Sequence, residues 1–169
     1  KIFGVVGVGN VGSKVAQVAQ AFGMKVLLCD PPRMRREGAG FVPFEKIVSD
    51  CDFISFHTPL NRHGEDKTLH LFNHTTIDKL NHGVTVFNTS RGEVIETDAL
   101  LKAINTGVVA HAVIDVWENE PNINLVAQAG IERDDIVDLV LVGNPIMHHL
   151  VLGLDPVPLG GAPFALATD

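Results

Sequence analysis

Three glycines near the start of the chain have the spacing of a phosphate-binding turn. Gly7, Gly9 and Gly12 form a GxGxxG pattern between an apolar run and a segment with helical periodicity. In such a turn the first glycine allows a tight bend, the second admits a pyrophosphate, and the third lets helix and strand pack closely. The N–H groups of Asn10, Val11 and Gly12 would then face the phosphates at the positive end of the helix. Glycine-rich turns also serve structural purposes, so the pattern alone leaves both interpretations open.

An acidic residue follows at the distance that a dinucleotide site requires. Asp30 lies about 18 residues after Gly12, at the expected end of the second strand, where its carboxylate would accept both hydroxyls of an adenosine ribose. This carboxylate would repel a 2′-phosphate, so the sequence predicts NAD as the cofactor and not NADP. Arg33, Arg35 and Arg36 oppose this, because arginines after the second strand can bind a 2′-phosphate. We interpret them as solvated side chains of a loop and give Asp30 more weight.

Two later segments place polar residues where strands are expected to end. Residues 88–92 (NTSRG) follow one predicted strand and residues 115–121 (DVWENEP) end the next. In open α/β sheets, ligands bind beyond the carboxyl ends of the strands. The glycines alone do not distinguish a nicotinamide dinucleotide from S-adenosylmethionine or a flavin, and these two segments narrow the choice.

The elements that must position these residues alternate between two periodicities. Short apolar runs predict buried parallel strands, and apolar residues at three- and four-residue steps predict helices, with Gly23 at the end of the first helix. This order predicts an α/β fold with a doubly wound, Rossmann-type parallel sheet and an atypical C-terminal segment. Pro31 and Pro32 are expected to end the second strand without starting a helix. The predicted strands are 2–8, 25–30, 52–57, 84–88 and 108–116, and the predicted helices are 11–22, 43–49, 75–80 and 97–105.

The composition limits the class of protein. The chain has 169 residues, of which 46% are hydrophobic, which is enough for one domain with a core. A net charge of -7 disfavours nucleic acid or an anionic membrane as a partner. Cys29 and Cys51 form no metal-binding or disulfide pattern, and no apolar run has the length of a membrane helix. We therefore expect a cytoplasmic protein that binds a small-molecule substrate and no structural metal.

The phosphate turn and the two later segments together resemble the D-2-hydroxyacid dehydrogenases over residues 1 to about 125. Within that family, residues 30–33 (DPPR), 57–60 (HTPL) and 67–71 (KTLHL) are similar to the erythronate-4-phosphate dehydrogenase branch. The resemblance implies hydride transfer between a 2-hydroxy acid, 4-phosphoerythronate in this branch, and NAD, in pyridoxal phosphate biosynthesis. It also implies a homodimer, and a substrate domain that this chain does not include.

The resemblance assigns roles to individual residues. Arg91 matches the residue that binds the substrate carboxylate, through bidentate hydrogen bonds. Glu120 matches the carboxylate that orients the family's catalytic histidine and stabilises its charged form. Asp115 matches the residue that binds the nicotinamide carboxamide. The further cofactor contacts that the resemblance implies are Thr58 and the turn of Thr89, Ser90 and Arg91.

The family's pattern fails after residue 125. Its catalytic histidine should follow Glu120 in a Thr-Pro-His-like setting, which this chain does not have. Residues 141–150 (LVGNPIMHHL) and 153–164 (GLDPVPLGGAPF) instead resemble the actin-like ATPase domains of corrinoid-activating ferredoxin proteins. We therefore predict an NAD-binding domain at residues 1–125 and a segment of different origin at residues 126–169.

Three functions follow from these resemblances. The chain is a dehydrogenase domain, an NAD-binding module without turnover, or part of a corrinoid-activating ATPase. The sequence favours the first by ancestry and the second for this chain, because the catalytic histidine is missing. His148 or His149 could replace it, although a histidine pair in an apolar helical stretch is more often buried than catalytic. We interpret the other histidines as surface or core residues.

Overall fold

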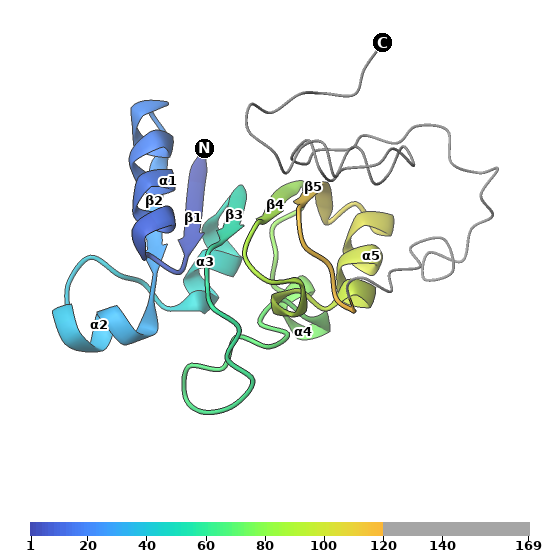
Figure 1. The fold of residues 1–169 in the computed structure, drawn as a ribbon. Coiled ribbons are helices and arrows are strands. Elements are labelled where there is room, and N and C mark those ends of the chain that lie inside the picture. The colour runs from blue at the N-terminus through green and yellow to red at the C-terminus, as the bar shows by residue number, and fades with distance from the viewer. Residues whose placement is uncertain (120–169) are drawn as a thin grey trace, which may run out of the picture. The chain divides into compact units, whose positions relative to one another are not determined.

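Five parallel strands form one sheet in the computed structural model, which describes residues 1–119 (Figure 1). The strand order is β2-β1-β3-β4-β5, so the order reverses between β1 and β3. This arrangement confirms the predicted doubly wound parallel sheet. The predicted C-terminal segment at 126–169 lies outside the described residues. The strands are β1 (Ile2–Val6), β2 (Lys25–Cys29), β3 (Phe53–Phe56), β4 (Val84–Asn88) and β5 (Val109–Ile114).

Helices cover the two faces of this sheet unequally. Helix α1 (Asn10–Ala21) packs on one face, against β1 and β2. Three helices contribute to the core on the other face, namely α3 (Phe44–Asp50), α4 (His74–Ile77) and α5 (Thr97–Asn105). A short 3-10 helix, Gly92–Val94, precedes α5. Since side chains alternate along a strand, Val5 packs beneath α1 while its neighbour Val6 joins the opposite core.

One helix was not predicted. Helix α2 (Pro31–Glu37) begins directly after Asp30, where we expected two prolines to lead into a loop. That prediction was wrong, because proline is compatible with the first turn of a helix, whose N–H groups have no partner within the helix. The predicted end of the first helix is confirmed: Gly23 has φ +75 and donates its N–H to the Gln20 carbonyl at 2.8 Å.

The larger core lies beneath α3, α4 and α5 and is centred on aromatic side chains. Phe56 is fully buried, and its ring meets that of Phe72 edge-on, with the centroids 6.3 Å apart. The ring of Phe44, at the start of α3, is tilted against the Phe56 ring, with the centroids 6.3 Å apart. These contacts hold α3 and residue 72 against the centre of the sheet, close to the ends of β1 and β3.

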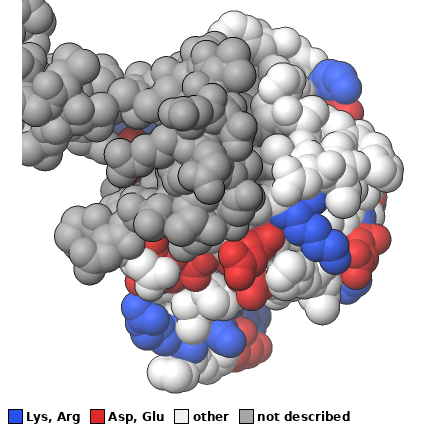
Figure 2. All heavy atoms as spheres, turned by 90° about the vertical axis from the view of Figure 1, so that its right-hand side faces the viewer, with Lys and Arg blue, Asp and Glu red and all other residues white. Residues whose placement is uncertain are grey.

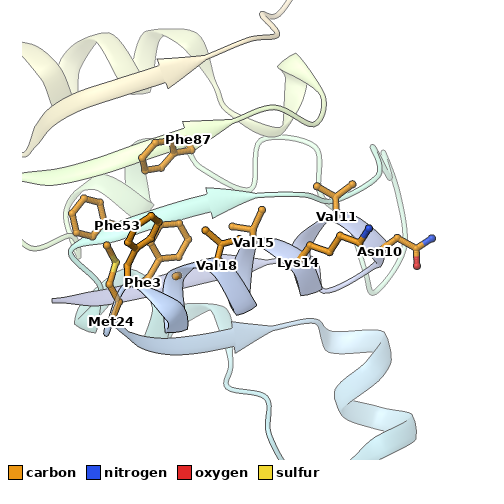
Figure 3. Close-up of a pocket in the computed structure, with 11 residues that line it drawn as sticks. Phe3, Asn10, Val11, Lys14, Val15, Val18, Met24, Phe53 and Phe87 are labelled. Atoms are coloured by element: carbon orange, nitrogen blue, oxygen red, sulfur yellow. The ribbon is translucent and has the colours of Figure 1, made fainter.

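The face that carries α1 has an apolar groove of about 520 Å³ (Figure 3). The rings of Phe3, Phe53 and Phe87 stack across β1, β3 and β4, with centroids 5.9 and 6.1 Å apart. Val18, on α1, and Phe22, directly after it, line the same groove and are largely exposed. Among the described residues, α1 therefore covers only the β1 and β2 half of this face.

Charged side chains of both signs adjoin one another on the face in Figure 2. Ion pairs account for many charged groups of residues 1–119, for example Arg62 with Glu93 at 2.9 Å. Among the helices of these residues, none has the length and apolar character needed to cross a membrane.

Truncating the central aromatic ring tests this description of the core. We expect Phe56→Ala to lower the free energy of unfolding by about 3–5 kcal/mol, because it leaves a cavity between Phe44 and Phe72. Urea unfolding followed by circular dichroism measures this change. Phe22→Ala is the matched control, since that ring is 76% exposed, and a similar loss in both variants would contradict the assignment of the core.

Candidate functional site

The phosphate turn has the geometry that its three glycines predict. Gly7 has φ +87, and a side chain there would meet the His57 carbonyl at 2.7 Å. At Gly12 a Cβ would lie 2.0 Å from the Gly7 carbonyl oxygen, so only glycine allows α1 to start this close to β1. A Cβ at Gly9 would meet nothing within 4 Å. The turn is therefore closed on its protein side and open at Gly9.

The first turn of α1 borders this open space. The helix starts at Asn10, and its N-cap residue, Gly9, provides no side-chain hydrogen bond. Asn10 and Val11 are exposed, whereas Gly12 is buried against the strand. A helix of 12 residues with an uncapped, accessible start attracts an anion through its N–H groups and its dipole.

Asp30 lies at the turn, as predicted, but it also makes contacts that the sequence did not predict. Its Oδ2 accepts the Val8 N–H at 2.9 Å, and its Oδ1 accepts the Arg33 N–H at 3.0 Å and so caps α2. Each carboxylate oxygen can accept a second hydrogen bond. The side chain thus faces the glycine turn and keeps the capacity to accept ribose hydroxyls.

The predicted loop at the three arginines was wrong, because all three lie on helix α2, although Arg35 and Arg36 are exposed as expected. Arg33 forms a bidentate pair with Glu37 within α2, at 2.8 and 2.7 Å. Arg35 binds the Asp66 carboxylate at 2.5 Å and approaches Glu65 at 3.3 Å. Arg36 is exposed on the same helix. The ion pairs of Arg33 and Arg35 both start from helix α2, which was not predicted.

A cavity of about 360 Å³ lies beside the turn, at the ends of β1, β2 and β3. Gly7, Asp30 and Thr58 line it together with apolar side chains from Pro31 and Phe44. The Thr58 Oγ1 atom is buried and has no hydrogen-bond partner among the described residues. A buried hydroxyl without a partner is unfavourable, so a ligand group that reached it would gain a hydrogen bond.

Burial affects the titratable groups around this cavity. It raises the pKa of the Cys29 thiol to about 12, and the negative charge of Asp30 acts in the same direction. Burial also lowers the pKa of His57, whose Nε2 lies 2.8 Å from Ser55 Oγ. Both groups are therefore neutral at pH 7. The charged side chains that bond the turn are those of Asp30 and Arg33, both at Val8.

A second cavity of about 340 Å³ lies at the ends of β4 and β5 and is lined mainly by polar groups. Ser90 and Arg91 line it from one side, and Trp117 and Asn119 line it from the other. The structure thus brings together the two segments that the sequence analysis singled out. Thr89 is exposed in the turn, and Asp115 donates its N–H to the Asn88 carbonyl at 3.0 Å.

Known families match the chain in two parts. A family described as the D-isomer specific 2-hydroxyacid dehydrogenase, NAD binding domain, matches residues 1–133. The chain belongs to this family. The match confirms the resemblance stated above and favours a nicotinamide dinucleotide over S-adenosylmethionine or a flavin. The RACo middle region matches residues 111–169, so the two matches overlap at residues 111–133. The predicted boundary after residue 125 lies within this overlap and stays a prediction.

The similar proteins are longer than this chain. The erythronate-4-phosphate dehydrogenase of Bacteroides thetaiotaomicron is 52% identical over 143 residues, which are 84% of this chain and 38% of that protein. That of Photorhabdus laumondii is 43% identical, over 86% of this chain and 36% of that protein. This chain therefore spans little more than a third of these relatives.

Solved structures confirm the fold. The NAD-dependent formate dehydrogenase of Staphylococcus aureus, in complex with NAD, has a TM-score of 0.67 at 27% identity and covers 79% of this chain and 39% of its own. The D-lactate dehydrogenase of Aquifex aeolicus, complexed with NAD and lactic acid, has a TM-score of 0.60 at 35% identity, over 70% and 35% of the two chains.

Two residues that the sequence analysis did not assign hold the second cavity of this dehydrogenase domain in shape. The buried Asn88 side chain accepts hydrogen bonds from the Ser90 N–H and Oγ–H and donates to the Arg91 carbonyl. An asparagine two residues before a serine is a signal for such a turn. Glu118 accepts the Thr97 N–H through Oε2 and contacts His70 through Oε1 at 2.7 Å. No local pattern predicts these contacts.

The other predicted residues have different outcomes. Glu120, His148 and His149 lie outside the described residues, so the predicted pairing of a carboxylate with a histidine stays a prediction. Within residues 1–119 there is no group of three or more histidine, cysteine or acidic side chains that could hold a metal ion.

Removing the Glu118 carboxylate tests its role beneath the second cavity. We expect Glu118→Ala to lower the free energy of unfolding by about 1–3 kcal/mol, because the Thr97 N–H loses its acceptor at the start of α5. Chemical denaturation measures the change. Glu93→Ala is a suitable control, since Glu93 pairs with an exposed arginine and should cost less than about 1 kcal/mol. Equal losses would argue against a buried anchoring role.

Proposed function

We propose that this chain is the NAD-binding domain of an erythronate-4-phosphate dehydrogenase. The intact enzyme would oxidise the C2 hydroxyl of 4-phosphoerythronate to a ketone, in pyridoxal phosphate biosynthesis. The observation that carries this proposal is the 52% identity with an erythronate-4-phosphate dehydrogenase over 84% of this chain. The open phosphate turn and the two cavities at the carboxyl edge of the sheet support it.

The residues of the first cavity fit a dinucleotide. The pyrophosphate would occupy the open space at Gly9, which a side chain there would fill. The uncapped start of α1 borders this space. Asp30 would accept the ribose hydroxyls, while the Thr58 hydroxyl would gain the partner that it lacks. When bound, NAD supplies the nicotinamide ring that accepts the hydride.

The residues of the second cavity would handle the substrate. Arg91 would bind the substrate carboxylate through two hydrogen bonds, and in the structure its Nη1 donates to the Ser90 carbonyl at 2.7 Å. Thr89 and Ser90 would contact the cofactor from the same turn. Asp115 is exposed at the end of β5, where it could bind the nicotinamide carboxamide. Glu120 would orient the histidine that takes the hydroxyl proton.

A second candidate function rests on the C-terminal part. The match of residues 111–169 to the RACo middle region supports a corrinoid-activating ATPase as the origin of the tail. Together with the missing Thr-Pro-His-like setting, this match also supports a chain that binds NAD without turnover. For the intact enzyme we propose a cytosolic homodimer, and the two free, buried cysteines fit a reducing compartment.

Nucleotide binding by this chain tests the proposal. We expect NAD to raise its melting temperature, since a ligand at about 100 times its Kd adds about 2.7 kcal/mol to the unfolding free energy. Gly9→Ala should weaken or abolish this stabilisation, because its Cβ enters the space of the pyrophosphate. A Cβ there meets no protein atom within 4 Å, so the cost to the free protein should be limited to the less favourable N-cap residue, about 1 kcal/mol. Gln17→Val, at an exposed position of α1, should keep the stabilisation by NAD. Stabilisation by ATP and not by NAD would contradict the proposal and support the ATPase origin.

Turnover is a separate test. We expect no NADH absorbance when this chain is mixed with NAD and 4-phosphoerythronate, because the predicted base is not in its usual place in the sequence. NADH formation would show that the chain contains a working base. His148→Ala and His149→Ala would then identify which histidine provides it.

A further inference from the structure

Arg33 lies beside Asp30, at the end of the site where an adenosine ribose would bind. Its Nη1 donates to the Val8 carbonyl at 2.6 Å, while Asp30 accepts the N–H of the same Val8 at 2.9 Å. The backbone N–H of Arg33 also donates to Asp30 Oδ1. The guanidinium and the carboxylate are thus both held on one residue of the phosphate turn. A phosphate on the 2′-oxygen of that ribose would meet both groups.

Glu37 holds the guanidinium from the opposite side. Its two oxygens accept the Nε and Nη2 hydrogens of Arg33 at 2.8 and 2.7 Å, one helical turn further along α2. The guanidinium also lies over the Phe41 ring, 5.0 Å from its centroid. A planar guanidinium held by a bidentate carboxylate, a carbonyl and a ring has little freedom to turn toward another anion.

The charges around Arg33 therefore disfavour a second phosphate. Glu37 compensates the charge of the guanidinium by pairing with it, and Asp30 adds a second negative charge nearby. Arg36, exposed on the same helix, acts on Glu37 but forms no bond to it among the contacts of the described residues. The hydrogen bond from Arg33 lowers the pKa of Glu37, so this carboxylate stays ionised near pH 7. An arginine at this position is otherwise the group that accommodates a 2′-phosphate.

We propose that Glu37 makes the site selective for NAD over NADP by binding Arg33 and neutralising its charge. Glu37 is then a specificity-determining residue that acts through Arg33. The inference rests on the proposed NAD-binding function and adds a second carboxylate to the selectivity that the sequence assigned to Asp30 alone.

Removing the charge of Glu37 tests this inference in the whole chain. We expect Glu37→Gln to lower the Kd for NADP by about threefold to tenfold, with less than a twofold change for NAD. Calorimetric titration with each nucleotide at two salt concentrations measures both constants, and the gain for NADP should shrink at the higher salt. Glu37→Asp, which keeps the charge, should keep the preference for NAD.

The Arg33→Gln background separates an effect that acts through Arg33 from direct repulsion of the phosphate by Glu37. There, Glu37→Gln should no longer improve NADP binding, because the cation that it releases is gone. Asp50→Asn is the matched control, since Asp50 forms a comparable pair with Lys46 four residues away on α3. It should leave the ratio of the two constants unchanged. Adding Asp30→Ser to Glu37→Gln should make NADP the tighter ligand.

Three results would contradict these expectations, each in a distinct way. An unchanged ratio in Glu37→Gln, in a chain that still binds NAD and has the melting temperature of the wild type, would overturn the inference alone. An equal gain for NADP with and without Arg33 would overturn it as well, because repulsion by Glu37 would then suffice. Failure of the wild-type chain to bind either nucleotide would instead contradict the proposed function.

Discussion

The hydrogen bond from the Val8 N–H to Asp30 Oδ2, 2.9 Å long, joins the turn after β1 to the end of β2. These strands are neighbours in the sheet, and the Gly7 N–H donates to the Cys29 carbonyl at 2.8 Å next to it. The turn is thereby fixed from the β2 side, while the contact of Gly12 with the Gly7 carbonyl fixes it from the helix side. The backbone at Gly9, which borders the open space, is thus held from both sides.

The second cavity is built by comparable ties between strand ends. The Asp115 N–H donates to the Asn88 carbonyl, which joins the end of β5 to that of β4. A Cβ on Gly92 would lie 2.0 Å from the Trp117 carbonyl oxygen, so the turn after β4 and the loop after β5 touch through their backbones. Glu118 then binds the loop to the start of α5. Arg91 is thus carried by a turn that is held at both ends.

Local sequence patterns predicted the sheet, the phosphate turn and the strand ends to within two residues; β1 ends at Val6, where we expected residue 8, and β5 at Ile114, where we expected residue 116. Apolar runs specify buried strands and glycine spacing specifies a backbone shape, so neither requires knowledge of distant contacts. Helix α2 was not predicted because two adjacent prolines cannot continue a strand or a helix, although they suit a first helical turn that Asp30 caps. The error extended to Arg33 and Arg35, whose partners depend on that helix. The contacts of Glu118 with His70 and Thr97 join residues 48 and 21 positions apart, which no local pattern specifies.

The two halves of the site differ in how much of the chain they need. The phosphate turn, Asp30 and Thr58 follow β1, β2 and β3, and the residues that line the first cavity lie between Val6 and Leu71. The second cavity is completed only by residues 116–119, within the overlap of the two family matches. Among the described strands β5 pairs only with β4, and the loop after it is held by the turn after β4 and by the start of α5. The part of the site proposed for the phosphates and the adenosine ribose is therefore built without the loop after β5, whereas the contacts proposed for the nicotinamide and the substrate need the ends of β4 and β5.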